Sequence, residues 1–142
     1  MSANINYLSI LLSAVVAWFF GAAYYGTLAK PWVAALGKTM EEFKQEQAAK
    51  VGRIGGMVPF VLSFFAELVM AWVLYGIMVH LKLFTLRAGM ISGAFIWFGF
   101  VLTTMAVNNA YTWRKPMLTV IDAAHWLGVL LIMGAIIGGM GQ

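Results

Sequence analysis

The sequence lacks cysteine altogether and has few charged residues. Charged residues make up only 10% of the 142 positions. Without cysteine the chain can form no disulfide, no thiolate nucleophile and no cysteine-based metal site. A soluble domain carries about 25% charged residues, so water is excluded as the solvent for most of this surface. The net charge of +4 is not gathered into a basic stripe, so we expect no nucleic-acid partner.

Apolar residues are what the sequence has in abundance. They make up 63% of the chain, and the mean hydropathy is +0.88. A bilayer core of about 30 Å is crossed by about 20 apolar residues in a helix. Four segments meet that requirement, at residues 7–28, 57–81, 86–108 and 119–140. The sequence therefore predicts an all-α fold, with residues 1–142 forming one polytopic domain, a four-helix bundle in the lipid bilayer.

Lysine and arginine are distributed unevenly between the connections. The first connection, residues 29–56, and the third hold most of them, whereas the second is poor in basic residues. The first contains Lys30, Lys38, Lys44, Lys50 and Arg53, the second contains Lys82 and Arg87, and the third contains Arg114 and Lys115. Basic loops stay in the cytoplasm. We therefore expect the first and third connections inside and both termini outside.

The first connection is the one sizeable polar segment. Thr39 followed by Glu42 is a capping-box pattern that predicts a helix start. We expect a short amphipathic helix on the cytoplasmic membrane surface between the first two spans. Two interpretations remain open, a solvated linker helix and a docking site for a partner.

Two glycine pairs predict close helix packing. Gly89 and Gly93 lie in the third span, and Gly134 and Gly138 lie in the fourth. Glycines four residues apart let helix backbones approach closely in a membrane. The pattern indicates packing without naming the partner.

Glu67 is the one acid placed near the middle of a span. It lies about 15 Å from the cytoplasmic end of the second span, with no basic residue within a turn. A charge at this depth costs about 2.5–3.5 kcal/mol on insertion scales, so the carboxyl should be neutral or face a polar cavity. Ser63, one turn away, lies on the same helix face. Glu67 is either a proton site or a hydrogen-bonded packing residue.

Asp122 and His125 lie near the start of the fourth span. Thr119 and Asp122 have capping-box spacing after Pro116, which predicts that Asp122 caps this helix. His125 lies one turn further on the same face. It is either a neutral histidine bonded to a neighbouring helix or a part of a functional site.

The amides Asn108 and Asn109 end the third span. Together with Asp122 and His125 they could line a cytoplasmic vestibule that leads towards Glu67. This arrangement is a hypothesis about how a solute or proton would approach the acid.

No enzyme signature is present in the sequence. It contains neither a phosphate-binding Gly-Lys-Ser/Thr loop nor a His-Glu-x-x-His motif. We therefore predict no enzyme and no cofactor. The one alternative is a membrane metalloenzyme with Glu67, Asp122 and His125 as ligands.

Two segments of the chain resemble a known family. They are "INYLSILLSAVVAWFFGAAYYG" (residues 5–26) and "GAFIWFGFVLTTMAVNNAYTWRKPMLTVIDAAHWLGVLLIMGAIIG" (residues 93–138). Both are similar to a bacterial family catalogued as domain of unknown function 1761. The resemblance implies a small four-helix integral membrane protein of the bacterial cytoplasmic (inner) membrane. It implies no activity and no catalytic residue.

Two functions remain as hypotheses. One is proton-linked or small-solute permeation centred on Glu67, in a protein that self-associates because four short helices rarely enclose a pathway alone. The other is an accessory subunit that packs against a larger membrane complex through its glycine faces.

Overall fold

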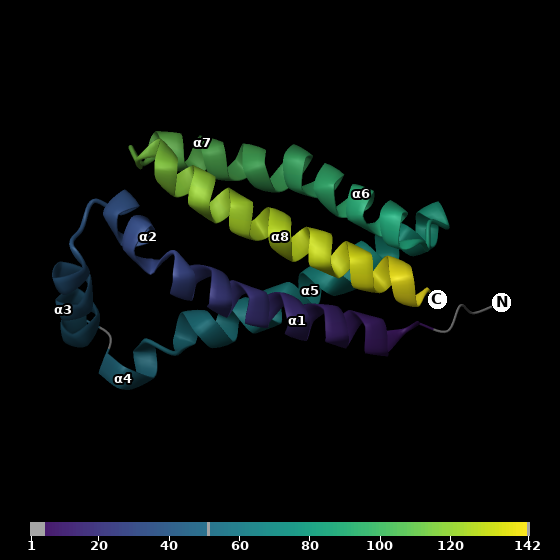
Figure 1. The fold of residues 1–142 in the computed structure, drawn as a ribbon, viewed down its shortest axis with the longest axis horizontal. Helices are drawn as coiled ribbons and strands as arrows, with labels where there is room; N and C mark the ends of the chain where they lie inside the picture. The colour runs from purple at the N-terminus through teal and green to yellow at the C-terminus, as the bar shows by residue number, and fades with distance from the viewer. Residues whose placement is uncertain (1–4, 51, 142) are drawn as a thin grey trace.

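The computed structural model describes residues 5–50 and 52–141, and in this part of the chain the fold is all-α (Figure 1). The elements in chain order are α1 (Tyr7–Thr27), α2 (Ala29–Ala35), α3 (Met40–Lys50), α4 (Gly52–Gly55), α5 (Val58–Leu81), α6 (Leu86–Ile96), the π-helical segment η1 (Trp97–Leu102), α7 (Thr103–Tyr111) and α8 (Pro116–Met140). The predicted all-α class is confirmed.

Four of these helices are long and apolar enough to cross a membrane. They are α1, α5, the continuous run from α6 through η1 to α7 (Leu86–Tyr111), and α8. Most of their outward side chains are apolar, and on the third helix Phe95 is 75% exposed and Phe100 is 73% exposed. Rings of this size have no reason to face water, so these helices indicate an integral membrane protein.

The four long helices do not pack equally against one another. α8 packs against α6 on one side and against α1 on the other, and α1 in turn packs against α5 (Figure 1). The chain ends meet at one end of the bundle, where Asn6 Nδ2 donates to the carbonyl of Gly141 at 3.3 Å and Tyr75 Oη accepts from Asn6 N at 2.9 Å. A chain that crosses a membrane an even number of times has both ends on the same side, as the four long helices place them here.

The hydrophobic core lies in the half of the bundle nearer to the termini. Its buried members come from α1, α5 and α8: Ile10, Ala14, Ala17, Ala71, Leu74, Tyr75, Met78, Val129, Met133 and Ile137. Small side chains on α1 let the three helices approach closely in this half. Beyond Ala17 and Ala71, towards the first connection, this close packing gives way to a pocket.

The α6–α8 contact is made through glycine. A Cβ atom on Gly89 would lie 1.8 Å from the carbonyl oxygen of Gly134, and one on Gly138 would lie 2.2 Å from that of Thr85. A Cβ on Gly93 would lie 2.4 Å from the oxygen of Leu130. The two glycine pairs thus pack against this chain's own neighbouring helix.

The third helix changes its winding in the middle. η1 has π-helical turns, which are wider than α-helical turns and shift every later side chain around the axis. The Gly93 face would recur near residue 107 in an uninterrupted α-helix. After the wide turns it is Asn109 that meets α8, where its Nδ2 donates to Thr119 Oγ1 at 2.9 Å.

The first connection folds into short helices at the end away from the termini (Figure 1). α3 begins as the capping box predicts, because Thr39 Oγ1 accepts from Glu42 N at 3.2 Å and Glu42 Oε2 accepts from Thr39 N at 2.9 Å. Glu46 pairs with Lys38, and this hydrogen bond lowers the pKa of the Glu46 carboxyl from its ordinary value. Glu46 also lies 4.0 Å from Lys50.

The predicted helix cap at Asp122 is wrong. α8 begins at Pro116, with extended backbone at Lys115 and no side-chain cap. Proline is favoured in the first helical turn because it lacks the N–H that would have no partner there. This start places Asp122 in the second turn, where its own backbone no longer needs a cap.

Candidate functional site

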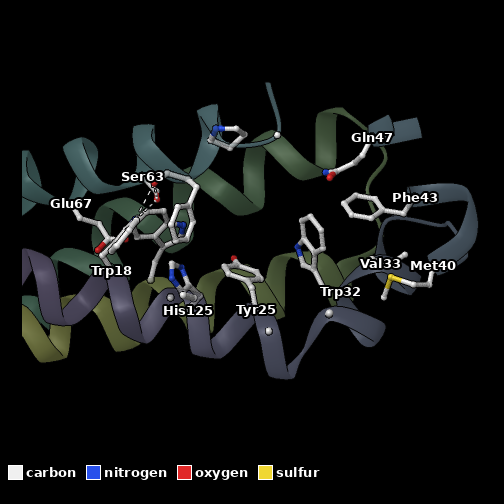
Figure 2. Close-up of a pocket in the computed structure, with 18 residues that line it drawn as sticks. Trp18, Tyr25, Trp32, Val33, Met40, Phe43, Gln47, Ser63, Glu67 and His125 are labelled. Carbon is white, nitrogen blue, oxygen red and sulfur yellow. Dashed lines mark hydrogen bonds between the residues drawn. The ribbon is translucent and has the colours of Figure 1, made fainter. Parts of the chain in front are cut away.

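A pocket of about 640 Å³ opens between α1 and α5 on the side of the first connection. Figure 2 shows the side chains that surround it. Most of them are aromatic or small; the full lining is Trp18, Gly21, Ala22, Tyr25, Gly26, Ala29, Trp32, Val33, Met40, Phe43, Gln47, Gly56, Pro59, Phe60, Ser63, Glu67, His125 and Trp126. The pocket is closed towards the termini by the packed core.

Glu67 lies at the closed end of this pocket. Its side chain is 2% exposed, about 14 Å along α5 from Val58. Oε2 is buried and has no hydrogen-bond partner among the described residues. A buried carboxyl oxygen is normally hydrogen-bonded. This one is available to a proton, a water molecule or a ligand.

His125 reaches the same pocket from α8. It is 4% exposed, and its Nδ1 has no partner among the described residues. The imidazole is stacked on Phe20, with ring centroids 6.0 Å apart and an interplanar angle of 5°. Tyr25 and Trp126 each lie 4.8 Å from it. Aromatic contact thus fixes the ring, while Nδ1 has no hydrogen-bond partner in the described part of the chain.

Gly21 makes the placement of His125 possible. A Cβ atom at position 21 would lie 2.8 Å from His125 Nε2, which is closer than non-bonded carbon and nitrogen atoms approach. The absence of a side chain on α1 therefore creates the space that the imidazole fills.

Asp122 is hydrogen-bonded to two aromatic side chains of the pocket lining, Tyr25 and Trp32. Its Oδ1 accepts from Tyr25 Oη at 2.7 Å and from Trp32 Nε1 at 3.0 Å. Both donors are rings that line the pocket, one on α1 and the other on α2. The carboxylate thus lies behind the wall and orients it, and it does not itself line the pocket.

Trp18 closes the gap between α1 and α5 in a similar way. Its Nε1 donates to the carbonyl of Phe60 at 3.0 Å and to Ser63 Oγ at 3.2 Å. The Trp18 and Phe60 ring centroids are 4.3 Å apart. Ser63 is thus engaged with Trp18 (Figure 2), and its hydroxyl also donates to the Phe60 carbonyl at 2.8 Å.

The structure brings together only some of the residues selected from the sequence. Glu67, Ser63 and His125 line one pocket. Asn108 is exposed, and Asn109 is bonded to Thr119 on α8. Neither amide lines the pocket, so the predicted vestibule is wrong: the pocket that leads to Glu67 is lined mainly from α1, α2, α3 and α5, with His125 and Trp126 from α8.

The three predicted metal ligands do not form a cluster. Within residues 5–50 and 52–141 no group of three or more His, Asp or Glu side chains could hold a metal ion. Asp122 accepts hydrogen bonds from Tyr25 and Trp32, and it does not line the pocket that contains Glu67. The metalloenzyme alternative therefore has no ligand set in the described part of the chain.

Sequence reasoning missed the aromatic residues of the pocket. Trp18, Tyr25 and Trp32 follow one another at seven-residue intervals, a spacing that returns to the same face of a helix every two turns. Aromatic residues near the ends of spans are usual in membrane proteins, so their number alone carried no signal. The seven-residue spacing, with Gly21 and Gly26 between them, would have identified this face.

The comparisons with known proteins give one match. No curated protein and no solved structure matches the chain. The model of a family described as "Protein of unknown function (DUF1761)" matches residues 8–138. That range includes nearly all of the four long helices, nearly all of the first segment that carried the resemblance and the whole of the second. The chain therefore belongs to the DUF1761 family.

Proposed function

We propose that the protein is a proton-linked permeation protein for small solutes. In this proposal the pocket between α1 and α5 admits the solute, and Glu67 binds and releases the proton. It is a binding and permeation function, without enzymatic chemistry.

The observation that supports this most strongly is the unpartnered carboxyl of Glu67 at the closed end of a pocket. A glutamate kept for packing would be hydrogen-bonded across a helix interface, because an unpaired buried acceptor costs about 1–3 kcal/mol. Glu67 Oε2 has no such partner in the described residues. An acid that remains in a membrane helix without a packing partner is favoured as a functional group.

Protons can reach Glu67 through the pocket. Its volume of about 640 Å³ far exceeds the roughly 10–15 Å³ that one water molecule needs. His125 supplies a second group that can accept and donate a proton, with Nδ1 unpartnered on the pocket side of α8. A short chain of water between the two groups would complete a proton path from the first connection.

The closed side of the pocket supports alternating access. Towards the termini the way is closed by the core residues Ala17, Ala71 and Leu74. These side chains are small or apolar and contribute no hydrogen bonds or ion pairs, so the polar contact that would have to break between α1 and α5 at this end is the hydrogen bond from Asn6 N to Tyr75 Oη. Permeation would require α1 and α5 to separate at this end and approach at the other, as in transporters that expose a central site to each side in turn.

We propose a bacterial cytoplasmic (inner) membrane location, with the first and third connections inside and both termini outside, on the basis of the lysine and arginine distribution. In that orientation the pocket opens to the cytoplasm. We also propose self-association, because the third helix packs mainly against α8 and leaves its other faces uncovered.

The accessory-subunit alternative has less support. Its docking surface was the glycine pairs, and Gly89, Gly93, Gly134 and Gly138 are all occupied by the α6–α8 contact within this chain. A partner would have to displace one of the chain's own helices to use them.

The test is proton flux in proteoliposomes. Vesicles would contain a pH-sensitive dye, and a potassium diffusion potential would drive protons inward. We expect wild-type protein to acidify the lumen and Glu67→Gln to lose this activity, because glutamine keeps the shape but cannot release a proton. Glu41→Gln on the exposed side of α3 is the matched control. Equal flux in wild type and Glu67→Gln would refute the proposal.

A further inference from the structure

We propose that the solute is a lipophilic organic cation, such as an aromatic or alkyl ammonium ion. Its charge would pair with the carboxylate of Glu67, and its apolar body would lie against the aromatic rings of the pocket. This inference rests on the proposed function and specifies the chemical class of solute.

The charge of the lining favours a cation. Among the described residues that line the pocket there is no lysine or arginine, and the one acid is Glu67. The two buried atoms without partners are Glu67 Oε2 and His125 Nδ1. An anion would meet no lysine or arginine here, whereas a cation would neutralise the one buried carboxylate.

The aromatic residues present ring surface to the pocket, with few free polar groups. The indole N–H of Trp18 is bonded to Phe60 and Ser63, and the polar atoms of Tyr25 and Trp32 are both bonded to Asp122. A neutral, strongly hydrogen-bonding solute would therefore find few partners.

What remains of these side chains is their π-electron surface. The face of an aromatic ring attracts cations, and most strongly when the ring is tryptophan. Figure 2 shows the rings of Tyr25 and Trp32 projecting into the same space, with Phe43 beyond them near the α3 end. Tyr25 and Trp32 have centroids 5.7 Å apart, and Trp32 and Phe43 have centroids 5.6 Å apart.

This row of rings leads from the mouth of the pocket to the acid. A cation can therefore move from ring to ring and lose its water gradually before it reaches Glu67. Such stepwise desolvation is what a membrane site for a lipophilic cation needs, since stripping an ion of all its water in one step is costly.

Binding would exchange a proton for the cation. The carboxylic acid of Glu67 loses its proton to pocket water, and the carboxylate that forms pairs with the incoming cation, so the net charge of the site does not change. The other titratable groups facing this pocket are Tyr25 from α1 and His125 from α8. From α3 the pocket receives only uncharged side chains, Met40, Phe43 and Gln47.

The experiment measures binding to the purified full chain in detergent. The probe is benzyltrimethylammonium, and the comparison compound is neopentylbenzene, which has the same shape without the charge. Quenching of tryptophan fluorescence reports binding, because Trp18, Trp32 and Trp126 all line the pocket. A pH indicator in weakly buffered solution reports proton release.

We expect the cation to bind at least about tenfold more tightly than the neutral compound, a difference of about 1.4 kcal/mol. Binding should release up to one proton, and the affinity should fall by up to about tenfold for each unit of pH decrease while Glu67 is protonated. Glu67→Gln should lose the preference for the cation and the proton release. Glu41→Gln should retain both.

Equal binding of the two compounds, or no binding of the cation, would overturn the inference. Neither result would affect Glu67-dependent proton flux, so the proposed function would stand and the solute would belong to another class. Conversely, proton flux that is independent of Glu67 would refute the proposed function, whatever the binding result. If Glu67→Gln does not fold, the cation preference and proton release of the wild type decide the question.

Discussion

Replacing Gly134 by alanine should disrupt the α6–α8 contact far more than the same change five residues later. A Cβ at Gly134 would lie 2.1 Å from the carbonyl oxygen of Gly89 and 3.0 Å from the amide nitrogen of Met90. Ordinary contact needs about 3.5 Å, so the helices would have to separate by about 1 Å or more. Both obstructing atoms are backbone atoms and cannot rotate away. Overpacking of this kind costs about 1–3 kcal/mol.

Gly139→Ala is the matched control for that change. It lies on the same helix, and its Cβ would meet nothing within 4 Å. Alanine is a better helix former than glycine by up to about 1 kcal/mol, so Gly139→Ala should be neutral or slightly stabilising.

Unfolding in mixed micelles with increasing SDS, followed by circular dichroism, measures both variants. We expect Gly134→Ala to unfold at clearly lower SDS than wild type, and Gly139→Ala at the same or higher SDS. If Gly134→Ala matches Gly139→Ala, α6 and α8 do not approach through these glycines.

Three further outcomes are expected. Tyr25→Phe should lower stability by about 0.5–1.5 kcal/mol, because it removes a hydrogen bond to Asp122. In the same SDS titration, Tyr7→Phe on the exposed face of α1 should have no effect. Equal effects of the two changes would contradict the Asp122 contact. Because pairing with Lys38 lowers the pKa of Glu46, the stability from this pair is present above the carboxyl's unfolded pKa and is lost as pH falls through the folded pKa. The protection of the α3 amides against hydrogen exchange, taken relative to the intrinsic exchange rate at each pH, should therefore decrease in acid. Glu46→Gln should remove that decrease, and an unchanged protection profile would count against the pair. A reporter inserted in α3 should be cytoplasmic and one at the C-terminus external, and the reverse result would overturn the proposed orientation.

The four long helices could be predicted because the hydrocarbon core of a bilayer determines their length and their apolar composition. A hydrocarbon core requires about 20 apolar residues in each crossing and a backbone that satisfies its own hydrogen bonds, and hydropathy records the first requirement directly. The helix ends were less predictable. α8 begins at Pro116, before Thr119 and Asp122, the polar residues that resembled a cap. Proline is favoured in the first helical turn because it lacks the N–H that would have no partner there.

The winding change at η1 left no recognisable trace in the sequence. The residues from Trp97 to Leu102 are apolar throughout, so hydropathy is the same for α- and π-helical turns. Trp97 Nε1 donates to the carbonyl of Ala123 on α8 at 2.7 Å. Such a contact depends on how two helices pack, which local patterns do not encode.

The polar residues of the site were predictable one by one, but their grouping was not. Glu67 and His125 stood out because acids and histidines are rare in apolar segments. Asp122 was misread because a local spacing, Thr119 to Asp122, resembled a capping box, whereas its partners Tyr25 and Trp32 lie about 90 residues away in the chain. The amides were wrongly grouped with the site because the helix that faces the pocket opposite α1 is α5, not the third span.

The most direct test of the central claim, that Glu67 exchanges protons with the pocket, is infrared spectroscopy of the reconstituted protein during a pH titration. A protonated carboxyl has a carbonyl stretching band that disappears on ionisation. We predict a pH-dependent band in wild type and in Glu41→Gln that is missing from Glu67→Gln, and whose intensity falls when benzyltrimethylammonium is added. Identical titrations of wild type and Glu67→Gln would mean that Glu67 exchanges no proton, and would contradict the account.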